Sequence, residues 1–143
     1  MKAYKSGITK DLFEVITSHI SHTQKGWGSE DLIHNGNHCV KIMKLEPGFQ
    51  VSMHWHAQKE ETFILISGEM LIQTINKFGK STITLLTNPL DSFTLDKNVP
   101  HTFYCPGGQE EETVFIEAST TDNPDDSYRV FPSGPCGKYS INR

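Results

Sequence analysis

Short runs rich in Val, Ile, Thr and Phe follow one another along the chain from residue 37 onward, separated by Gly, Pro, Asn and Asp. β-branched and aromatic residues favour strands, whereas the intervening residues favour turns. The pattern predicts seven strands: CVKIMKLE, ETFILIS, EMLIQTI, STITLLT, SFTL, VPHTFYC and ETVFIEAS. Many short strands at near-regular spacing are typical of an antiparallel sandwich or barrel. We therefore expect an all-β fold.

The two ends of the chain are less regular. We expect a short irregular or helical segment over residues 1–36, with a helix around residues 9–18 and some edge segments. Residues 121–143 are polar and rich in turn formers, so we expect a tail that follows the surface and frays. A chain of 143 residues is long enough to bury one hydrophobic core. We expect a single domain over residues 1–143, with the barrel core at about 37–120.

The charge pattern argues against two classes of partner. The formal net charge is -4 and the sequence pI is about 5.9, and no basic cluster is present to attract nucleic acid or an anionic membrane. The first residues lack the apolar segment of a signal peptide, and no run of apolar residues is long enough to span a bilayer. We expect a cytoplasmic protein that binds neither nucleic acid nor membranes.

The three cysteines give no sign of a disulfide framework or a zinc knuckle. Cys39, Cys105 and Cys136 are odd in number, widely spaced and without a CxxC pair. We interpret each as a small buried or half-buried hydrophobic residue.

The stretch GFQVSMHWHAQKEETFILISG, residues 48–68, places ionisable residues within strand-forming sequence. Residues two apart in a strand share a face, so His54 and His56 project together. Glu61 begins the next strand, and an antiparallel hairpin would return its carboxylate to the two histidines. A closed barrel could bring His101 to the same interior point. We predict one divalent ion, Mn, Zn, Fe, Co or Ni, with open positions for a substrate.

The alternative is that these side chains are solvated and bind nothing. Inward-facing histidines and a glutamate without a metal would, however, each cost on the order of a few kcal/mol of desolvation. We therefore favour the metal site.

The spacing of the first motif carries a family resemblance. Gly48, five residues, His54, one residue, His56, four residues, Glu61, six residues and Gly68 resembles the first motif of the cupin family. The resemblance implies a jelly-roll β-barrel with the metal inside.

The second cupin motif matches less well. Pro100 and His101 fit, but Leu90, Asp96 and Asn98 stand where the family usually has Gly, Pro and Gly. His101 is therefore the ligand least supported by the resemblance, which covers residues 39–119.

A narrower resemblance concerns function. GWG at 26–28, VKIMKLEPGFQVSMHWH, FIEAST and DDSYRV are similar to segments of cupin-domain sugar isomerases, namely type II phosphomannose isomerases and D-lyxose isomerases. In the lyxose isomerases a His-x-His-x-x-Lys-x-Glu string combines metal ligands with a catalytic lysine and glutamate. The same string here is His54, His56, Lys59 and Glu61, and Glu117 corresponds to a later glutamate. The resemblance implies a sugar or sugar phosphate isomerase or epimerase that works through an enediol.

Within that reaction Glu117 is our preferred base, because strand alternation places it on the inward face with Thr113 and Phe115. We expect the metal to hold Glu61. Lys59 could neutralise the enediolate or hold a hydroxyl or phosphate, but it could equally be a solvated lysine in a turn.

Two other functions stay open at this point. The same ligands could serve a mononuclear iron dioxygenase, or the protein could be a non-catalytic sugar-binding cupin that keeps the metal for stability. For each function we expect a small-molecule partner, a sugar in the isomerase and the binding protein. We also expect a homodimer, because exposed strand edges need to be covered.

Overall fold

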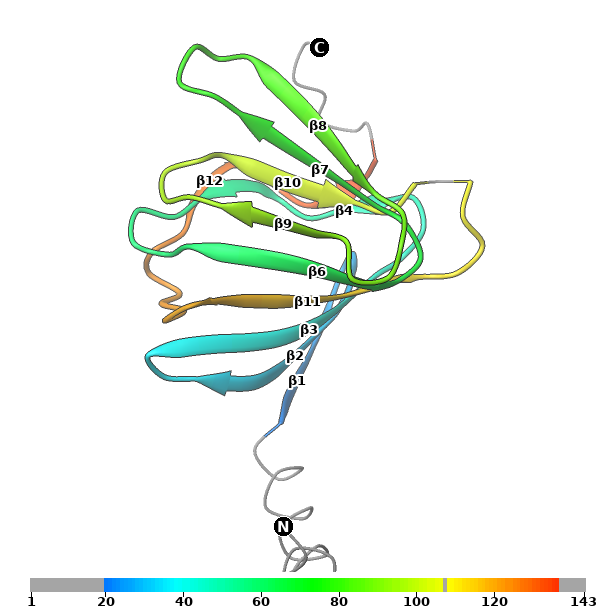
Figure 1. Cartoon of the computed structure of the whole chain (residues 1–143), viewed down its shortest axis with the longest axis horizontal. Coiled ribbons are helices and arrows are strands. Elements are labelled where there is room, and N and C mark those ends of the chain that lie inside the picture. The colour runs from blue at the N-terminus through cyan, green and yellow to red at the C-terminus, as the bar shows by residue number, and fades with distance from the viewer. Residues whose placement is uncertain (1–19, 107, 137–143) are drawn as a thin grey trace, which may run out of the picture.

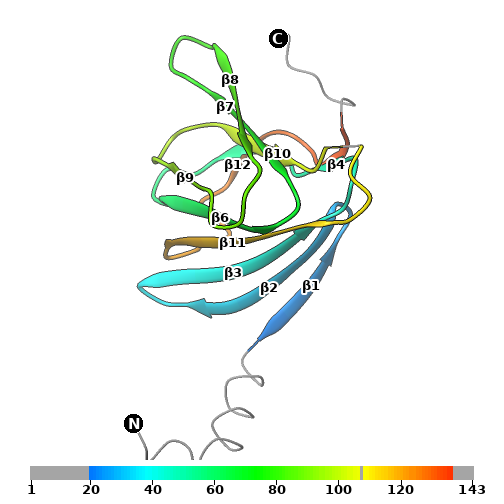
Figure 2. The same ribbon diagram turned by 45° about the vertical axis from the view of Figure 1, so that its right-hand side comes forward.

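The structure, a computed structural model, describes residues 20–106 and 108–136. Two antiparallel sheets face each other across the core (Figures 1 and 2). The first sheet runs in the order β1 (Ser21–Lys25), β2 (Gly28–Asn35), β3 (His38–Leu45), β11 (Thr113–Thr120), β6 (Glu61–Ser67) and β9 (Ser92–Leu95). The second contains β12 (Tyr128–Phe131), β5 (Met53–Trp55), β10 (His101–Tyr104), β4 (Phe49–Gln50) and β13 (Gly134–Pro135). β7 (Met70–Ile75) pairs with β10, and β8 (Ser81–Leu86) pairs with β7.

These elements confirm the all-β prediction and include all seven strands expected from the sequence. The helix expected at residues 9–18 lies outside the described residues. No helix in the described ranges is long and apolar enough to cross a lipid bilayer. Cys39 and Cys105 are fully buried, whereas Cys136 is exposed, and all three thiols are free.

The inward side chains of the first sheet change from apolar to ionisable along the strands. Phe115 on β11 pairs with Met43 on β3, and two residues further along β11 Glu117 pairs with Lys41. β6 follows the same trend and reaches Glu61 at its first residue. All five side chains are buried. One end of the interior is therefore a hydrophobic core, and the other is a polar site.

Three phenylalanines form the centre of the hydrophobic core. The ring of Phe63 lies 5.0 Å from Phe103 and 6.0 Å from Phe115, and Phe103 lies 5.1 Å from Phe115. The tilted and edge-on arrangements are those that aromatic pairs prefer. Phe63 and Phe115 belong to the first sheet and Phe103 to the second, so this cluster packs the two sheets together beside the polar site.

Tight turns between the strands include residues with a left-handed backbone. Gly48 and Gly68 have φ of 81° and 80°, as their places in the predicted turns indicate. A Cβ on Gly68 would also lie 3.1 Å from the Cα of Thr113. Leu90 and Asn98 have φ of 72° and 65°, the conformation that glycine adopts without strain. At these two positions the chain departs from the cupin pattern in residue type, while its backbone keeps a conformation suited to glycine.

The structure corrects the expectation of an irregular segment up to residue 36. Residues 21–35 form β1 and β2, which extend the first sheet beyond β3. The side chains of β1 are exposed, and β2 directs the carboxylate of Glu30 into the polar site. Neither strand therefore shows the apolar inward face by which strands are recognised in a sequence.

The expected surface tail is also corrected in its described part. β12 pairs with β5, and β13 pairs with β4, so residues 128–135 belong to the second sheet. Residues 137–143 lie outside the described part of the chain.

Candidate metal centre

Three histidines converge at the polar end of the interior. His54 on β5 and His101 on β10 are direct partners in the antiparallel register, and His56 follows β5. The ring centroid of His54 lies 4.5 Å from that of His101 and 5.0 Å from that of His56. One nitrogen from each ring lies within 4.8 Å of the other two. The structure thus brings together the three histidines predicted to bind a metal.

Each histidine uses its Nδ1 atom to bind a backbone carbonyl. A carbonyl oxygen can only accept a hydrogen bond, so the proton lies on Nδ1 and the lone pair of Nε2 is directed elsewhere. Such bonds fix metal-binding histidines in orientation and tautomer. The partners are Ser52 O for His54 at 2.9 Å, Asp126 O for His56 at 2.5 Å and Val99 O for His101 at 2.9 Å.

The Nε2 atoms of His56 and His101 are buried and have no hydrogen-bond partner among the residues that the structure describes. They face the carboxylate of Glu61, at 3.6 Å from Oε1 and 3.1 Å from Oε2 respectively. Lone pairs on both sides of such a gap repel one another unless a cation or a proton lies between them. The residues therefore fit a divalent metal ion with nitrogen and oxygen ligands.

Electrostatics keep His54 and Glu61 in the protonation states that metal binding requires. Burial lowers the pKa of His54 to about 3, and the neighbouring His101 and His56 contribute to the shift. Burial alone would raise the pKa of Glu61, but His101, Lys59 and His56 outweigh it and hold that pKa well below its usual range. At neutral pH the site presents a neutral imidazole and a carboxylate, as metal ligation requires.

The expected hairpin between the histidines and Glu61 is wrong. His54 belongs to β5 in the second sheet, and Glu61 begins β6 in the first. The segment 57–60 crosses from one sheet to the other, so the carboxylate approaches the histidines across the interior. The proximity was predicted from the spacing, but the route of the chain was not.

Lys59 is 4% exposed and contacts three carboxylates. Its Nζ lies 2.9 Å from Asp122 Oδ1, 3.1 Å from Glu61 Oε1 and 3.2 Å from Glu117 Oε2. Burial lowers the pKa of a lysine, but these three carboxylates raise that of Lys59 above its usual range. The interpretation of Lys59 as a solvated turn residue is therefore wrong.

Glu117 faces inward with Thr113 and Phe115, as strand alternation predicted. Burial, followed by the negative charge of Glu61, raises its pKa to about 7, while Lys59 and Lys41 act in the opposite direction. A carboxyl group with a pKa near neutrality can both accept and release a proton. Glu60, the neighbour of Lys59 in the crossing segment, is exposed.

Glu30, Lys41 and Asp122 help to build the site and were not predicted. Lys41 Nζ lies 2.6 Å from Glu30 Oε1 and 2.9 Å from Asp122 Oδ2, which extends the charged network to β2. Asp126 accepts hydrogen bonds from the amides of Ala57 and Gln58 at 2.8 and 3.0 Å. The signal for Lys41 was its inward position within CVKIMKLE, where alternation calls for an apolar residue. The two aspartates lie in a loop, whose path a strand pattern does not reveal.

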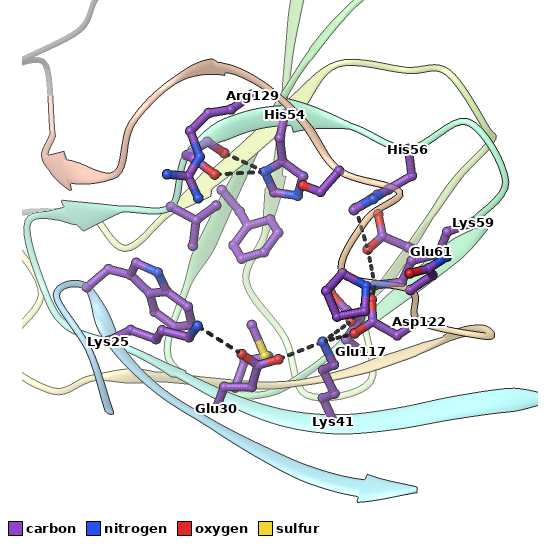
Figure 3. Close-up of a pocket in the computed structure, with 18 residues that line it drawn as sticks. Lys25, Glu30, Lys41, His54, His56, Lys59, Glu61, Glu117, Asp122 and Arg129 are labelled. Carbon is purple, nitrogen blue, oxygen red and sulfur yellow. Dashed lines mark hydrogen bonds and ion pairs between the residues drawn. The ribbon is translucent and has the colours of Figure 1, made fainter. Parts of the chain in front are cut away.

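A cavity of about 710 Å³ connects these groups (Figure 3). One part of its wall is apolar and includes Trp27, Met43 and Phe103, and the remainder is charged. Figure 3 shows the labelled histidines across the cavity from Glu30 and Lys41, which come from the other sheet. The cavity is therefore large and polar enough for a small hydrophilic molecule.

Comparisons with known proteins agree with this fold. A family model described as "Cupin domain" matches residues 41–117. A mannose-1-phosphate guanylyltransferase from Salmonella muenchen is 29% identical over 105 residues, which cover 73% of this chain and 21% of that protein. The chain thus spans about a fifth of the length of this relative.

Solved structures show the same architecture. Oxalate decarboxylase from Bacillus subtilis matches with a TM-score of 0.69 at 18% identity, over 79% of this chain and 30% of that one. CapF, solved with the inhibitor 3-isopropenyl-tropolone, matches with a TM-score of 0.67 at 18% identity, over 87% of this chain and 40% of that one. At such identities the likeness concerns the fold alone.

Proposed function

Because the chain belongs to the cupin domain family, we propose that it is a metal-dependent cupin that isomerises or epimerises a sugar or sugar phosphate. The observation that carries the proposal is the position of Glu117, a buried carboxyl group with a pKa of about 7, in the same cavity as the histidine cluster. A proton-transfer group beside a candidate metal site is what an enediol reaction needs.

His54, His56, His101 and Glu61 would hold the ion. Mn, Zn, Fe, Co and Ni all accept such nitrogen and oxygen ligands. A bound divalent ion would supply Lewis-acid stabilisation of the negative charge that gathers on the sugar's carbonyl oxygen.

Glu117 would move the proton. In the isomerisation its carboxylate accepts a proton from the carbon beside the carbonyl and returns it to the former carbonyl carbon, while the hydroxyl proton of the first carbon passes to the former carbonyl oxygen, so that the reaction consumes no other reagent. Lys59 Nζ, 3.2 Å from Glu117 Oε2, orients that carboxylate and places a positive charge beside the enediolate. Glu61 remains a ligand and takes no part in the proton transfer.

The character of the cavity supports a sugar as the substrate. Asp122, Asn123 and Ser127 offer hydrogen-bonding groups, and Trp27 offers an apolar face on which a sugar ring can pack. The relative named mannose-1-phosphate guanylyltransferase takes its name from a sugar phosphate, which is consistent with this class of ligand.

Solvent exchange tests the proposal directly. The metal-loaded protein is incubated in deuterium oxide with a panel of aldoses, ketoses and their phosphates, and deuterium incorporation is followed by NMR. We expect exchange with at least one sugar, a rate that rises as the pH passes through about 7, and loss of exchange in Glu117→Gln with the metal retained. Absence of exchange with every sugar would refute the isomerase.

The same preparation separates the two other functions. Oxygen consumption that depends on iron would identify a dioxygenase. Sugar binding without turnover, at an affinity that Glu117→Gln leaves unchanged, would identify a non-catalytic binding protein.

A further inference from the structure

Arg129 on β12 is a cation of the cavity wall that no carboxylate neutralises within the described part of the chain. We propose that Arg129 binds an anionic group of the substrate, a carboxylate or a phosphate monoester, and thereby selects an acidic sugar. The inference rests on the proposed function and adds to it the chemical class of the sugar.

The register of the second sheet places Arg129 at the metal centre. Arg129 is the direct cross-strand partner of His54, and side chains of such partners lie on the same face of the sheet. Figure 3 shows the arginine side chain beside His54, at the rim of the cavity. A ligand that reaches the open side of the histidine cluster therefore passes within reach of the guanidinium group.

The other cations of the cavity already have partners. Lys59 contacts three carboxylates, as described above. Lys41 lies 2.6 Å from Glu30, and Lys25 lies 3.7 Å from the same side chain. These lysines form ion pairs with the protein's own carboxylates, so Arg129 is the cation best placed to bind a negative charge on the ligand.

The charge of the whole cavity favours an anion. Four basic side chains line it, Lys25, Lys41, Lys59 and Arg129, and four acidic ones, Glu30, Glu61, Glu117 and Asp122. A divalent ion added to this balanced set leaves an excess of positive charge. An anionic ligand reduces that excess, and the exposed position of Arg129 at the rim leaves its guanidinium group accessible to the ligand.

The chemistry of the guanidinium group suits this role. It is planar, always charged and able to donate two parallel hydrogen bonds to a carboxylate or a phosphate. Glu117 projects from β11 in the first sheet, opposite the sheet that carries Arg129. A sugar held by its anionic end at Arg129 thus directs its remaining carbons toward the proton-transfer group.

Three sugars that differ at one carbon test the inference. Glucose, glucuronate and glucose 6-phosphate are titrated into the Mn²⁺-loaded protein by calorimetry. This measurement reports binding and does not depend on turnover. We expect at least one acidic sugar to bind about tenfold or more tightly than glucose, and Arg129→Gln to remove most of that difference. The tighter of the two acidic sugars tells whether the site prefers a carboxylate or a phosphate.

Two further variants make the result specific. Arg129→Lys keeps the charge without the planar fork and should recover only part of the preference. Lys80→Gln, which removes a cation from the exposed β7–β8 turn, should bind all three sugars as the original protein does. Equal binding of the three sugars, failure of both acidic sugars to bind, or an unchanged preference in Arg129→Gln would overturn the inference.

The outcome is separable from that of the isomerase test. Arg129-dependent binding of an acidic sugar without deuterium exchange would refute the isomerase and leave the anion site standing. Exchange with neutral sugars that bind as tightly as acidic ones would support the isomerase and refute the anion site.

Discussion

His101 lies directly opposite His54 across β10 and β5, with ring centroids 4.5 Å apart. The resemblance supported His101 least of the candidate ligands, because the motif around it departs from the cupin pattern. The strand register places His101 beside His54 independently of the motif, since the side chains of a direct cross-strand pair share a face of the sheet.

The His101→Ala variant should lose its metal. Removal of an imidazole from the cluster leaves the ion with fewer ligands and opens a buried gap beside Glu61, so we expect metal affinity to fall by roughly a hundredfold or more. Metal analysis of the purified protein and competition with a chelator measure the change. His38→Ala, at an exposed position on β3, is the matched control, and metal retained in His101→Ala would refute the ligand assignment.

Asp126 should influence the metal without touching it. Its carboxylate holds the amides of Ala57 and Gln58 and so fixes the loop whose histidine binds the Asp126 carbonyl. We expect Asp126→Ala to weaken metal binding by about 10- to 100-fold and to lower the free energy of unfolding by about 1–3 kcal/mol. Chelator competition and urea unfolding measure both effects. Asp125→Ala, at the exposed neighbouring residue, should alter neither.

Lys59→Met should destabilise the fold. The change leaves three carboxylates without their shared cation in a buried site, and we expect a loss of about 3–5 kcal/mol in the free energy of unfolding. The double variant Lys59→Met with Glu117→Gln removes one of those charges and should recover part of the loss. Lys97→Met, at an exposed position, serves as the control in urea unfolding, and a Lys59→Met variant of equal stability would contradict the network.

Asp122 should make the free energy of unfolding depend on pH in the acidic range. The charges of Lys59 and Lys41 outweigh burial and hold the pKa of Asp122 below its ordinary value of 3.8. Its ion pairs therefore stabilise the fold above about pH 4, and the contribution is lost as the pH falls through the lowered pKa. Asp122→Asn should be less stable than the original protein at pH 7, by about 1 kcal/mol after allowance for partial exposure. The difference should shrink toward pH 3 in urea titrations, and a difference independent of pH would argue against this origin.

Leu90→Gly should be tolerated, in contrast to most substitutions by glycine. Leu90 is 74% exposed and has a φ of 72°, so glycine relieves backbone strain and removes little buried surface. Relief of the backbone strain stabilises the folded state by about 1 kcal/mol. Glycine also increases the conformational entropy of the unfolded chain, which lowers the stability by a similar amount. We expect a melting temperature that is unchanged or slightly raised. Leu85→Gly, at an exposed position within β8, should lower it.

The sequence revealed the features that repeat or contain a fixed spacing. Alternating residues gave the seven central strands, and the spacing of His54, His56 and Glu61 indicated a shared site. It did not reveal β2, whose inward Glu30 faces Lys41. The ion pair between these two strands is visible only once both strands are in place, and the same holds for the contacts of the loop that carries Asp122 and Asp126.

Other expectations stay predictions. The identity of the metal, the catalytic roles of Glu117 and Lys59, and the homodimer each await the corresponding measurement. The structure does show that Lys59 is buried among three carboxylates and is not a solvated turn residue.

The crossing of residues 57–60 between the sheets has a mechanical consequence. Candidate ligands lie on both sides of this segment, so a single ion would cross-link the two sheets. His54 and His101 would bind it from the second sheet and Glu61 from the first. Binding energy gained only in the folded state adds to folding stability. Loading with metal should therefore slow amide hydrogen exchange in β6 and β11 as well as in β5 and β10, so that the two layers open together.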